Sequence, residues 1–291
     1  MAACSLKTRA LSRWPRYNFY SYILPLEKDS PVSARKLFKI VRIYILIMLL
    51  IGVALGSWLT SKRSTNWEQP LWIAIYPING DNSRVTQKYI DQLELEDFNS
   101  IESFISEEAQ EYNLPLKRPF TIKLAPQVKS LPPEPPLSGA TWEVMLWSMK
   151  LRYWAYQANT YQGPAPHIRV FVKYFDGKDK QPLAHSLGLQ KGMLGIVNAF
   201  ALNKMTAANA MVITHEILHT LGASDKYELG TGLPIYPEGY ADIEQNPLYP
   251  QETAEIMAGR IPISESEATI PRGLHQAILG PKTAREILWL K

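Results

Sequence analysis

The sequence predicts a mixed α/β (α+β) domain on a twisted, mostly parallel sheet, preceded by one transmembrane helix. From residue 67 onward, short apolar runs alternate with longer segments of helical spacing. Such alternation is typical of parallel strands joined by covering helices. Before this region, residues 43–59 form an apolar run without a charge. We therefore divide the chain into an N-terminal tail (1–36), a membrane segment (37–63) and a folded domain (64–291).

The apolar run reads IYILIMLLIGVALGSWL and is close to the shortest length that crosses the hydrocarbon core of a bilayer. Tyr44 and Trp58 stand near its two ends, where interfacial aromatic residues are common. A buried core helix is the alternative, but such a helix normally keeps a polar face and this run has none. We expect residues 43–60 to contact membrane lipid.

The charges around this run predict its direction. Nine Lys/Arg residues precede it, whereas only Lys62 and Arg63 follow it closely. The positive-inside rule therefore leaves the N-terminus in the cytoplasm and places the folded domain on the periplasmic (extracytoplasmic) side of the cytoplasmic membrane. A cleaved signal peptide is the rival interpretation, with Ala54 and Gly56 near a possible cut. Because some 42 residues precede the run, far more than a signal peptide uses, we favour an uncleaved single-pass anchor.

The formal net charge of +4 hides two segments of opposite sign. Residues 1–63 carry 11 Lys/Arg against 2 Asp/Glu, and residues 64–291 carry 20 against 25. The folded domain is therefore mildly acidic and has no basic stripe, which argues against nucleic acid as a partner. Cys4 is the single cysteine, so no intramolecular disulfide can form.

Five segments predict strands and three predict helices, in the order strand, helix, strand, helix, then three strands and a last helix. The strands are expected at 71–79, 120–128, 167–175, 183–190 (the weakest) and 193–202. The helices are expected at 85–112 (one or two helices), 141–161 and 206–221. A proline-rich loop, residues 129–139, is too short to separate two domains.

Two of these helices carry further signals. Thr141 and Thr206 are expected N-caps, and Gly222 is the expected end of the last helix. In the helix at 141–161, four large side chains recur at helical spacing, which predicts that they pack in the core: Trp142, Leu146, Met149 and Trp154.

The last helix contains HEILH, residues 215–219, which has the chemistry of a metal site. Positions four apart share one face of a helix, so His215 and His219 can present two imidazole nitrogens to one ion. Glu216 lies at the edge of that face, where its carboxylate can reach a water at the metal without binding the metal. A histidine pair satisfied by hydrogen bonds in the core is the alternative interpretation.

A third ligand is needed, because catalytic zinc sites usually have three protein ligands and an open fourth position. Gly222 can take a left-handed conformation and turn the chain back, which would carry Asp225 under the metal. The stretch HEILHTLGASD resembles the metzincin clan of zinc peptidases, in the branches that end in aspartate, as the snapalysin-like and immune-inhibitor-type enzymes do. The resemblance implies one Zn²⁺ per chain, held by His215, His219 and Asp225.

The resemblance has further implications for the fold and the chemistry of residues 64–291. It implies a catalytic domain in which 183–190 is an antiparallel edge strand that pairs with an extended peptide or protein substrate. AEIMAGR, residues 254–260, is similar to the methionine turn of the clan, with Met257 packing beneath the histidines. Peptide bonds would be hydrolysed by a zinc-activated water, with Glu216 as general base.

The chain departs from the clan at the tyrosine that some members place two residues after the turn methionine, where Gly259 stands. The sequence does not choose among three other tyrosines as the group that stabilises the oxyanion: Tyr227, Tyr236 and Tyr240. The remaining histidines, and two acidic residues, are expected to be structural or surface groups: His167, His185, His275, Glu238 and Asp242.

Three alternatives to the peptidase remain open. An inactive, envelope-anchored scaffold would be expected to have lost Glu216, which is present. A zinc hydrolase could act on an envelope component that is not a peptide. A purely structural zinc site would need four protein ligands, and no fourth is evident. The sequence gives neither the cleavage specificity, nor the mode of regulation, nor the oligomeric state.

Overall fold

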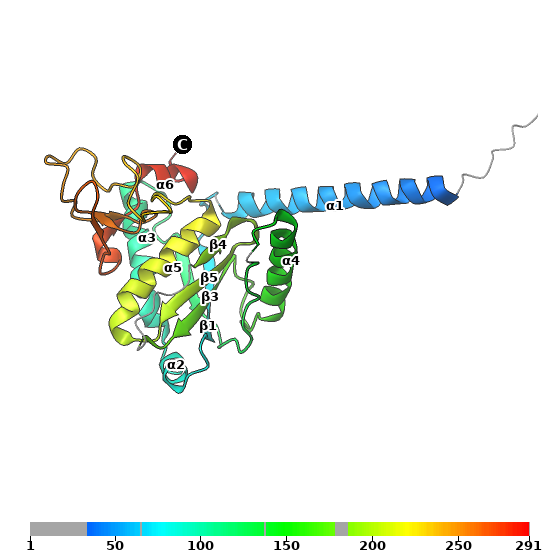
Figure 1. The fold of residues 1–291 in the computed structure, drawn as a ribbon, viewed down its shortest axis with the longest axis horizontal. Coiled ribbons are helices and arrows are strands. Elements are labelled where there is room, and N and C mark those ends of the chain that lie inside the picture. Colours follow the sequence, from blue (N-terminus) through cyan, green and yellow to red (C-terminus); the bar gives the residue numbers. More distant parts are fainter. Residues whose placement is uncertain (1–33, 65, 137, 178–185, 291) are drawn as a thin grey trace, which may run out of the picture. The chain divides into compact units, whose positions relative to one another are not determined.

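The computed structural model describes residues 34–64, 66–136, 138–177 and 186–290 (Figure 1). Its contacts divide the chain into two units, up to Ile51 and from Gly52 onward.

The first helix, α1, spans Ala34–Ser64. Its segment Lys36–Leu55 is long and apolar enough to cross a membrane, and none of that segment is buried in the protein. The core helix of a soluble domain would be mostly buried, so that alternative fails. The structure thus agrees with the expectation of an apolar helix of membrane-spanning length near the N-terminus. A signal sequence has the same length and composition.

A five-stranded sheet in the order β2-β1-β3-β5-β4 forms the centre of the second unit. Neighbouring strands are parallel except β4, which pairs antiparallel with β5 at the edge. The strands span Leu71–Asn79 (β1), Phe120–Leu124 (β2), Ile168–Phe175 (β3), Leu187–Leu189 (β4) and Leu194–Phe200 (β5). The predicted mixed α/β fold with a mostly parallel sheet is therefore confirmed.

Two strands are shorter than predicted. The strand expected at 120–128 ends at Leu124, and beyond it Val128 makes only an isolated bridge to Ile78. Of the strand expected at 183–190, the structure shows Leu187–Leu189, while 183–185 lie outside the described residues.

Helices α2 to α5 lie where the sequence pattern predicted helices but differ in detail, and α6 was not predicted. They span Arg84–Ile90 (α2), Asn99–Glu111 (α3), Thr141–Gln157 (α4), Thr206–Leu221 (α5) and Pro281–Glu286 (α6). The segment 85–112 is thus two helices, separated by a 3-10 turn at Leu95–Phe98. The N-cap predictions were wrong by one residue, because Ala140 and Met205 precede the first helical turns and neither side chain makes a cap hydrogen bond.

The C-terminal part after α5 contains short paired segments. Ala254–Glu255 (β6) pairs with Ala277–Ile278 (β9), and Ile261–Pro262 (β7) pairs with Ala268–Thr269 (β8). These pairings attach the turn at Met257 to the segment that leads into α6.

The sheet is covered on both faces (Figure 1). Alternate residues of a strand point to opposite faces, and β1 shows this directly. Ile73 and Ile75 pack in one core cluster with residues of α3 and α5. Ala74, Tyr76 and Ile78 pack in a second cluster with α4. Helices α3 and α5 therefore lie on one face and α4 on the other.

The prediction for the side chains of α4 was wrong for three of the four residues. Trp142, Leu146 and Met149 are 62%, 50% and 65% exposed. The sheet-facing positions are Leu151 and Ala155, which are fully buried. Large apolar side chains occupy several sides of this helix, so the spacing of four of them did not identify the buried side. The fourth, Trp154, does pack against Phe171, with ring centroids 4.6 Å apart.

The chain between α1 and β1 is attached to the core by Trp67. Its side chain is 5% exposed, and its indole nitrogen donates a 2.7 Å hydrogen bond to the Ile287 carbonyl. Its ring also packs against the rings of Phe120 and Trp289.

Replacing the buried tryptophan should cost far more stability than replacing an exposed one. Trp67→Ala removes a buried ring and leaves a cavity, which should lower the free energy of unfolding by about 3–5 kcal/mol. Trp142→Ala, on the exposed side of α4, should change it by no more than about 0.5 kcal/mol. Denaturant unfolding of the purified chains in detergent measures both, and equal losses would contradict the described packing.

Candidate metal centre

Helix α5 brings two imidazole rings together at one end of the sheet. His215 and His219, one turn apart, have ring centroids 4.6 Å apart. Their side chains are 14% and 18% exposed, so the rings are half-enclosed by the protein and still open on one side. The shared helix face predicted from the sequence is present.

Each ring is oriented by a backbone carbonyl. The Nδ1 atom of His215 lies 3.0 Å from the Ile256 oxygen, and the Nδ1 atom of His219 lies 2.7 Å from the Ala223 oxygen. A carbonyl oxygen only accepts, so each Nδ1 must carry the proton. In the neutral imidazole, Nε2 then keeps its lone pair, and this arrangement is common in histidines that bind metals.

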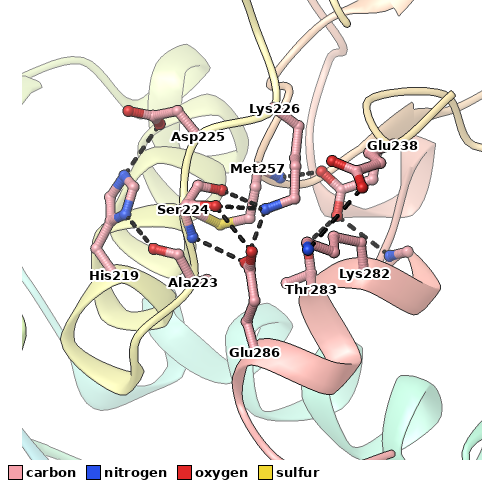
Figure 2. Close-up of polar contacts among 12 residues, drawn as sticks. His219, Ala223, Ser224, Asp225, Lys226, Glu238, Met257, Lys282, Thr283 and Glu286 are labelled. Atoms are coloured by element: carbon pink, nitrogen blue, oxygen red, sulfur yellow. Dashed lines mark hydrogen bonds and ion pairs between the residues drawn. The ribbon is translucent and has the colours of Figure 1, made fainter. Parts of the chain in front are cut away.

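The turn after α5 supplies a third ligand. Gly222 has a φ of 108°, a left-handed conformation that strains any other residue, and it ends the helix. Beyond it, the Asp225 Oδ1 atom lies 3.2 Å from Nε2 of His215. The same oxygen lies 3.1 Å from Nε2 of His219 (Figure 2). The sequence analysis predicted these three ligands, and the structure brings them together.

The three ligand atoms fit one metal ion. They lie within 4.8 Å of one another, and among the described residues this is the one such group of His, Cys, Asp or Glu. Tetrahedral ligands about 2.1 Å from a metal are separated by about 3.4 Å, close to the two contacts above. His215, His219 and Asp225 can therefore bind a metal ion, and the donor set alone does not say which metal.

The charges of the three groups support a bound cation. Burial by itself would raise the pKa of Asp225, but its hydrogen bonds to His215 and His219 outweigh burial and hold the pKa well below its usual range. Burial would lower the pKa of His219, but the Asp225 carboxylate and the Ala223 carbonyl outweigh it and raise the pKa. A proton on Nε2 thus takes the place that a metal ion would occupy.

A buried ion pair between Lys226 and Glu286 fixes the loop between Gly222 and Asp225. Lys226 is 3% exposed, and its ammonium donates to the carbonyl and hydroxyl oxygens of Ser224 and, at 2.7 Å, to Glu286 of α6 (Figure 2). Glu286 also accepts from the Ser224 backbone N–H and hydroxyl. No sequence spacing relates residues 226 and 286, so this support was missed.

Met257 lies in a tight turn, as the sequence predicted. Met257 is fully buried, and the backbone nitrogens of Ala258 and Gly259 both donate to the Glu255 carbonyl, which closes a tight turn. The preceding residue, Ile256, provides the carbonyl that orients His215. The Met257 carbonyl accepts from the Lys226 backbone nitrogen at 3.0 Å, so the turn and the ligand loop are joined directly.

Glu255 holds this turn from inside the protein, and the sequence analysis did not single it out. Its fully buried carboxylate accepts hydrogen bonds from the Met257 and Ala258 backbone nitrogens, the Gly280 nitrogen and the Thr283 hydroxyl. Burial raises the pKa of Glu255, and these four donors oppose the rise. The carboxylate therefore joins the turn to the start of α6.

A pocket of about 260 Å³ adjoins the metal ligands. Its polar part is formed by Ser186, His215, Glu216 and Tyr227, and Glu216 is 5% exposed. The rest of its lining is mostly apolar and comes from α5 and the C-terminal segments: Ala208, Met211, Val212, Ile256, Ile270 and Pro271. A water or a small substrate group in this pocket would meet Glu216 and one of the three candidate ligands, His215.

The edge strand lies directly against α5 at the two motif residues. A Cβ added to Gly188 would stand 2.4 Å from the His219 Cβ and 2.6 Å from the Glu216 carbonyl oxygen. Only glycine allows so close an approach. The expected antiparallel edge strand therefore borders the metal centre through Gly188.

The structure distinguishes among the three tyrosines that the sequence left open. Tyr227 lines the pocket beside Glu216, and its pKa is raised by burial first and then by the charges of Asp225 and Glu216. The hydroxyls of Tyr240 and Tyr249 are 2.7 Å apart, and Tyr236 packs against the Tyr240 ring, away from the pocket lining. Tyr227 is therefore the tyrosine at the site.

The other candidates stay outside the metal centre. His167 accepts a hydrogen bond from the Trp72 backbone nitrogen, and His275 lies in a 3-10 turn, Leu274–Gln276. Glu238 lies 3.9 Å from Lys282 on the surface, and Asp242 accepts from the Glu244 backbone nitrogen. His185 lies outside the described residues.

Comparison with known proteins identifies no family. No protein-family model and no curated protein matches the chain. Among solved structures, "Structure of a chaperone-substrate complex" is 10% identical with a TM-score of 0.32, and the match covers 76% of this chain and 36% of that one. Wild-type OgpA from Akkermansia muciniphila is 10% identical with a TM-score of 0.28, covering 76% of this chain and 63% of that one. The chain thus spans less than two thirds of either, and scores of this size carry no argument about fold or function.

Removing the Asp225 carboxylate should weaken metal binding by at least about a hundredfold, because even outer-shell partners of metal ligands are worth about 10–100-fold. The dissociation constant of Zn²⁺ is measured by chelator competition on the purified full chain and on Asp225→Ala. Asp242→Ala is the matched control, because it removes a surface carboxylate from the same C-terminal part. An unchanged affinity in Asp225→Ala would exclude Asp225 as a ligand.

Metal affinity should fall as the pH is lowered, and the fall should start above the ordinary histidine range. Protons and metal compete for Nε2 of His219, whose pKa is raised. Below that pKa, the apparent dissociation constant should rise about tenfold per pH unit for each proton displaced. Competition titrations across this range locate the midpoint. A midpoint below about 6.5 would contradict the described contacts of His219.

Proposed function

We propose that this chain is a membrane-anchored zinc metallopeptidase of the metzincin type. One observation carries the proposal: two imidazoles, each fixed by a carbonyl, converge with Asp225 beside the Glu216 carboxylate on the wall of a pocket. If the two histidines only filled hydrogen bonds in the core, no carboxylate would be needed in contact with both of their Nε2 atoms.

Zinc fits the donor set of two imidazole nitrogens and one carboxylate oxygen. A site with three protein ligands keeps a position for water or substrate, whereas structural zinc sites are closed by four. When bound, a zinc ion supplies Lewis-acid chemistry, which polarises a scissile carbonyl and makes a water more acidic. The partly exposed imidazoles leave that position accessible from the pocket.

The side chains of this protein would then divide the proton transfers. Glu216, adjacent to His215 and lining the pocket, takes a proton from the attacking water and later gives it to the leaving amine. Tyr227, on the same pocket wall, can donate its hydroxyl to the oxygen that becomes negative in the transition state. Its raised pKa keeps the hydroxyl protonated, as such a donor must be.

The shape of the site favours an extended peptide as the substrate. Among the described residues, edge strand β4 pairs on one side only, with β5, and an edge strand offers free backbone groups to an added strand. The apolar part of the pocket suits an apolar side chain of that peptide.

We place this domain outside the cytoplasm. The proposal takes α1 as an uncleaved anchor and derives its direction from the excess of Lys/Arg before the apolar run.

Glu216→Gln should abolish hydrolysis and leave zinc binding intact. The amide keeps the size of the side chain but cannot accept the proton, so kcat/KM should fall by about 10²–10⁴-fold. Cleavage of a fluorogenic peptide library by the zinc-loaded full chain gives the rate, and chelator competition gives the zinc affinity.

Glu238→Gln, a surface change on the same segment as the pocket wall, is the matched control and should retain full activity. Peptide cleavage that survives in Glu216→Gln would contradict the role of Glu216. A zinc-loaded wild-type chain that cleaves no peptide would contradict the peptidase itself, in favour of a hydrolase for a different envelope component or an inactive scaffold.

A further inference from the structure

We propose that the outer side of α4 docks onto the anionic phospholipid surface of the membrane that α1 spans. This inference is independent of the peptidase activity. It rests on the proposal that α1 is an uncleaved anchor.

The outer side of α4 is a continuous apolar stripe. Six large side chains on this helix are each between 50% and 75% exposed: Trp142, Met145, Leu146, Met149, Tyr153 and Tyr156. At 100° per residue they fall on the side opposite Leu151 and Ala155, the buried positions that contact the sheet. We call these six residues the α4 stripe.

Such a side is unusual for a helix that covers a sheet. A surface helix normally turns its apolar side to the core and charged residues to water. Soluble proteins rarely expose a large contiguous apolar patch unless a partner or a membrane covers it. Helix α4 already contacts the sheet through Leu151 and Ala155, so the stripe is an additional apolar surface beyond the core contact.

The composition and the flanking charges of the stripe favour a lipid surface as the occupant. Tryptophan and tyrosine are enriched where proteins meet the membrane–water interface, because their rings are both apolar and polar. Lys150 and Arg152 are exposed and flank the stripe on its two sides. Apolar residues bordered by cations are the pattern of helices that lie in the interface of anionic membranes.

The anchor keeps the domain within reach of that surface. Trp67 is buried in the domain core, whereas the residues expected to contact membrane lipid extend to Thr60. Only residues 61–66 lie between them, and even fully extended they span at most about 25 Å. A chain this short raises the effective concentration of lipid at the domain surface, so a modest intrinsic affinity of the stripe suffices.

Docking through α4 would place the metal centre on the far side of the sheet from the lipid. Helix α4 covers one face of the sheet and α5 covers the other. If the proposed peptidase holds, its substrate then arrives from the aqueous side.

The test measures how near the stripe lies to lipid in the full chain. In a Cys4→Ser background, a single cysteine replaces Met149 and carries an environment-sensitive fluorophore. The matched control carries the same probe at Gln110, an exposed position of α3. Both chains are reconstituted in vesicles of phosphatidylglycerol and phosphatidylcholine that contain a spin-labelled lipid quencher. The Met149 probe should be quenched several-fold more than the Gln110 probe, and less when phosphatidylglycerol is omitted.

A charge in the stripe should reverse the effect. Met145→Glu places a carboxylate beside the Met149 probe and should reduce its quenching towards the Gln110 value, because burying that charge in the interface is costly. Ser103→Glu, at an exposed position of α3, should change nothing.

Equal quenching at the two positions overturns the inference. So does a Met149 probe that is shielded from an aqueous quencher but not reached by the lipid quencher, because a second copy or another protein then covers the stripe. An alkaline wash distinguishes the underlying proposal: release of the chain from the vesicles overturns the uncleaved anchor and the docking together. None of these readouts depends on zinc or on peptide cleavage.

Discussion

The left-handed turn at Gly222 is the constraint on which the metal centre depends. The two histidines share a face on any helix of this sequence, but two imidazoles alone do not complete a catalytic site. The turn ends α5 at its last residue, Leu221, and reverses the chain so that Asp225 reaches both Nε2 atoms. The same reversal places the Ala223 carbonyl against Nδ1 of His219. One backbone conformation thus supplies a ligand and also orients another.

The turn holds its shape because buried polar groups fix it on two sides. Lys226 joins the loop to Glu286 of α6, and its backbone nitrogen joins it to the Met257 turn. The Glu255 carboxylate holds the Met257 turn by accepting hydrogen bonds from the Met257 and Ala258 backbone nitrogens. A buried charge without partners would be very costly, so each of these groups is stable only while the others stay in place. The C-terminal segment therefore contributes to the ligand geometry although it provides no ligand.

The sequence predicted the parts of this structure that depend on local patterns. Apolar runs gave the order of strands and helices, and the spacing of His215, His219, Gly222 and Asp225 gave the ligands, because helix period and glycine conformation are local properties. The supporting contacts could not be found in the same way. Lys226 and Glu286 are 60 residues apart, and Glu255 looks like an ordinary surface carboxylate in the sequence. Such pairs are defined by tertiary packing alone.

Helix α4 shows the opposite limit, where a local pattern is present but ambiguous. The spacing of apolar residues predicts that a helix has an apolar side. Where a helix has two such sides, the spacing does not predict which of them meets the sheet. In this helix Leu151 and Ala155 are buried against the sheet, while Trp142 and Met149 face outward. A helix with two apolar sides has two surfaces to cover. The sheet covers one, and the docking that we propose would cover the other with the lipid surface.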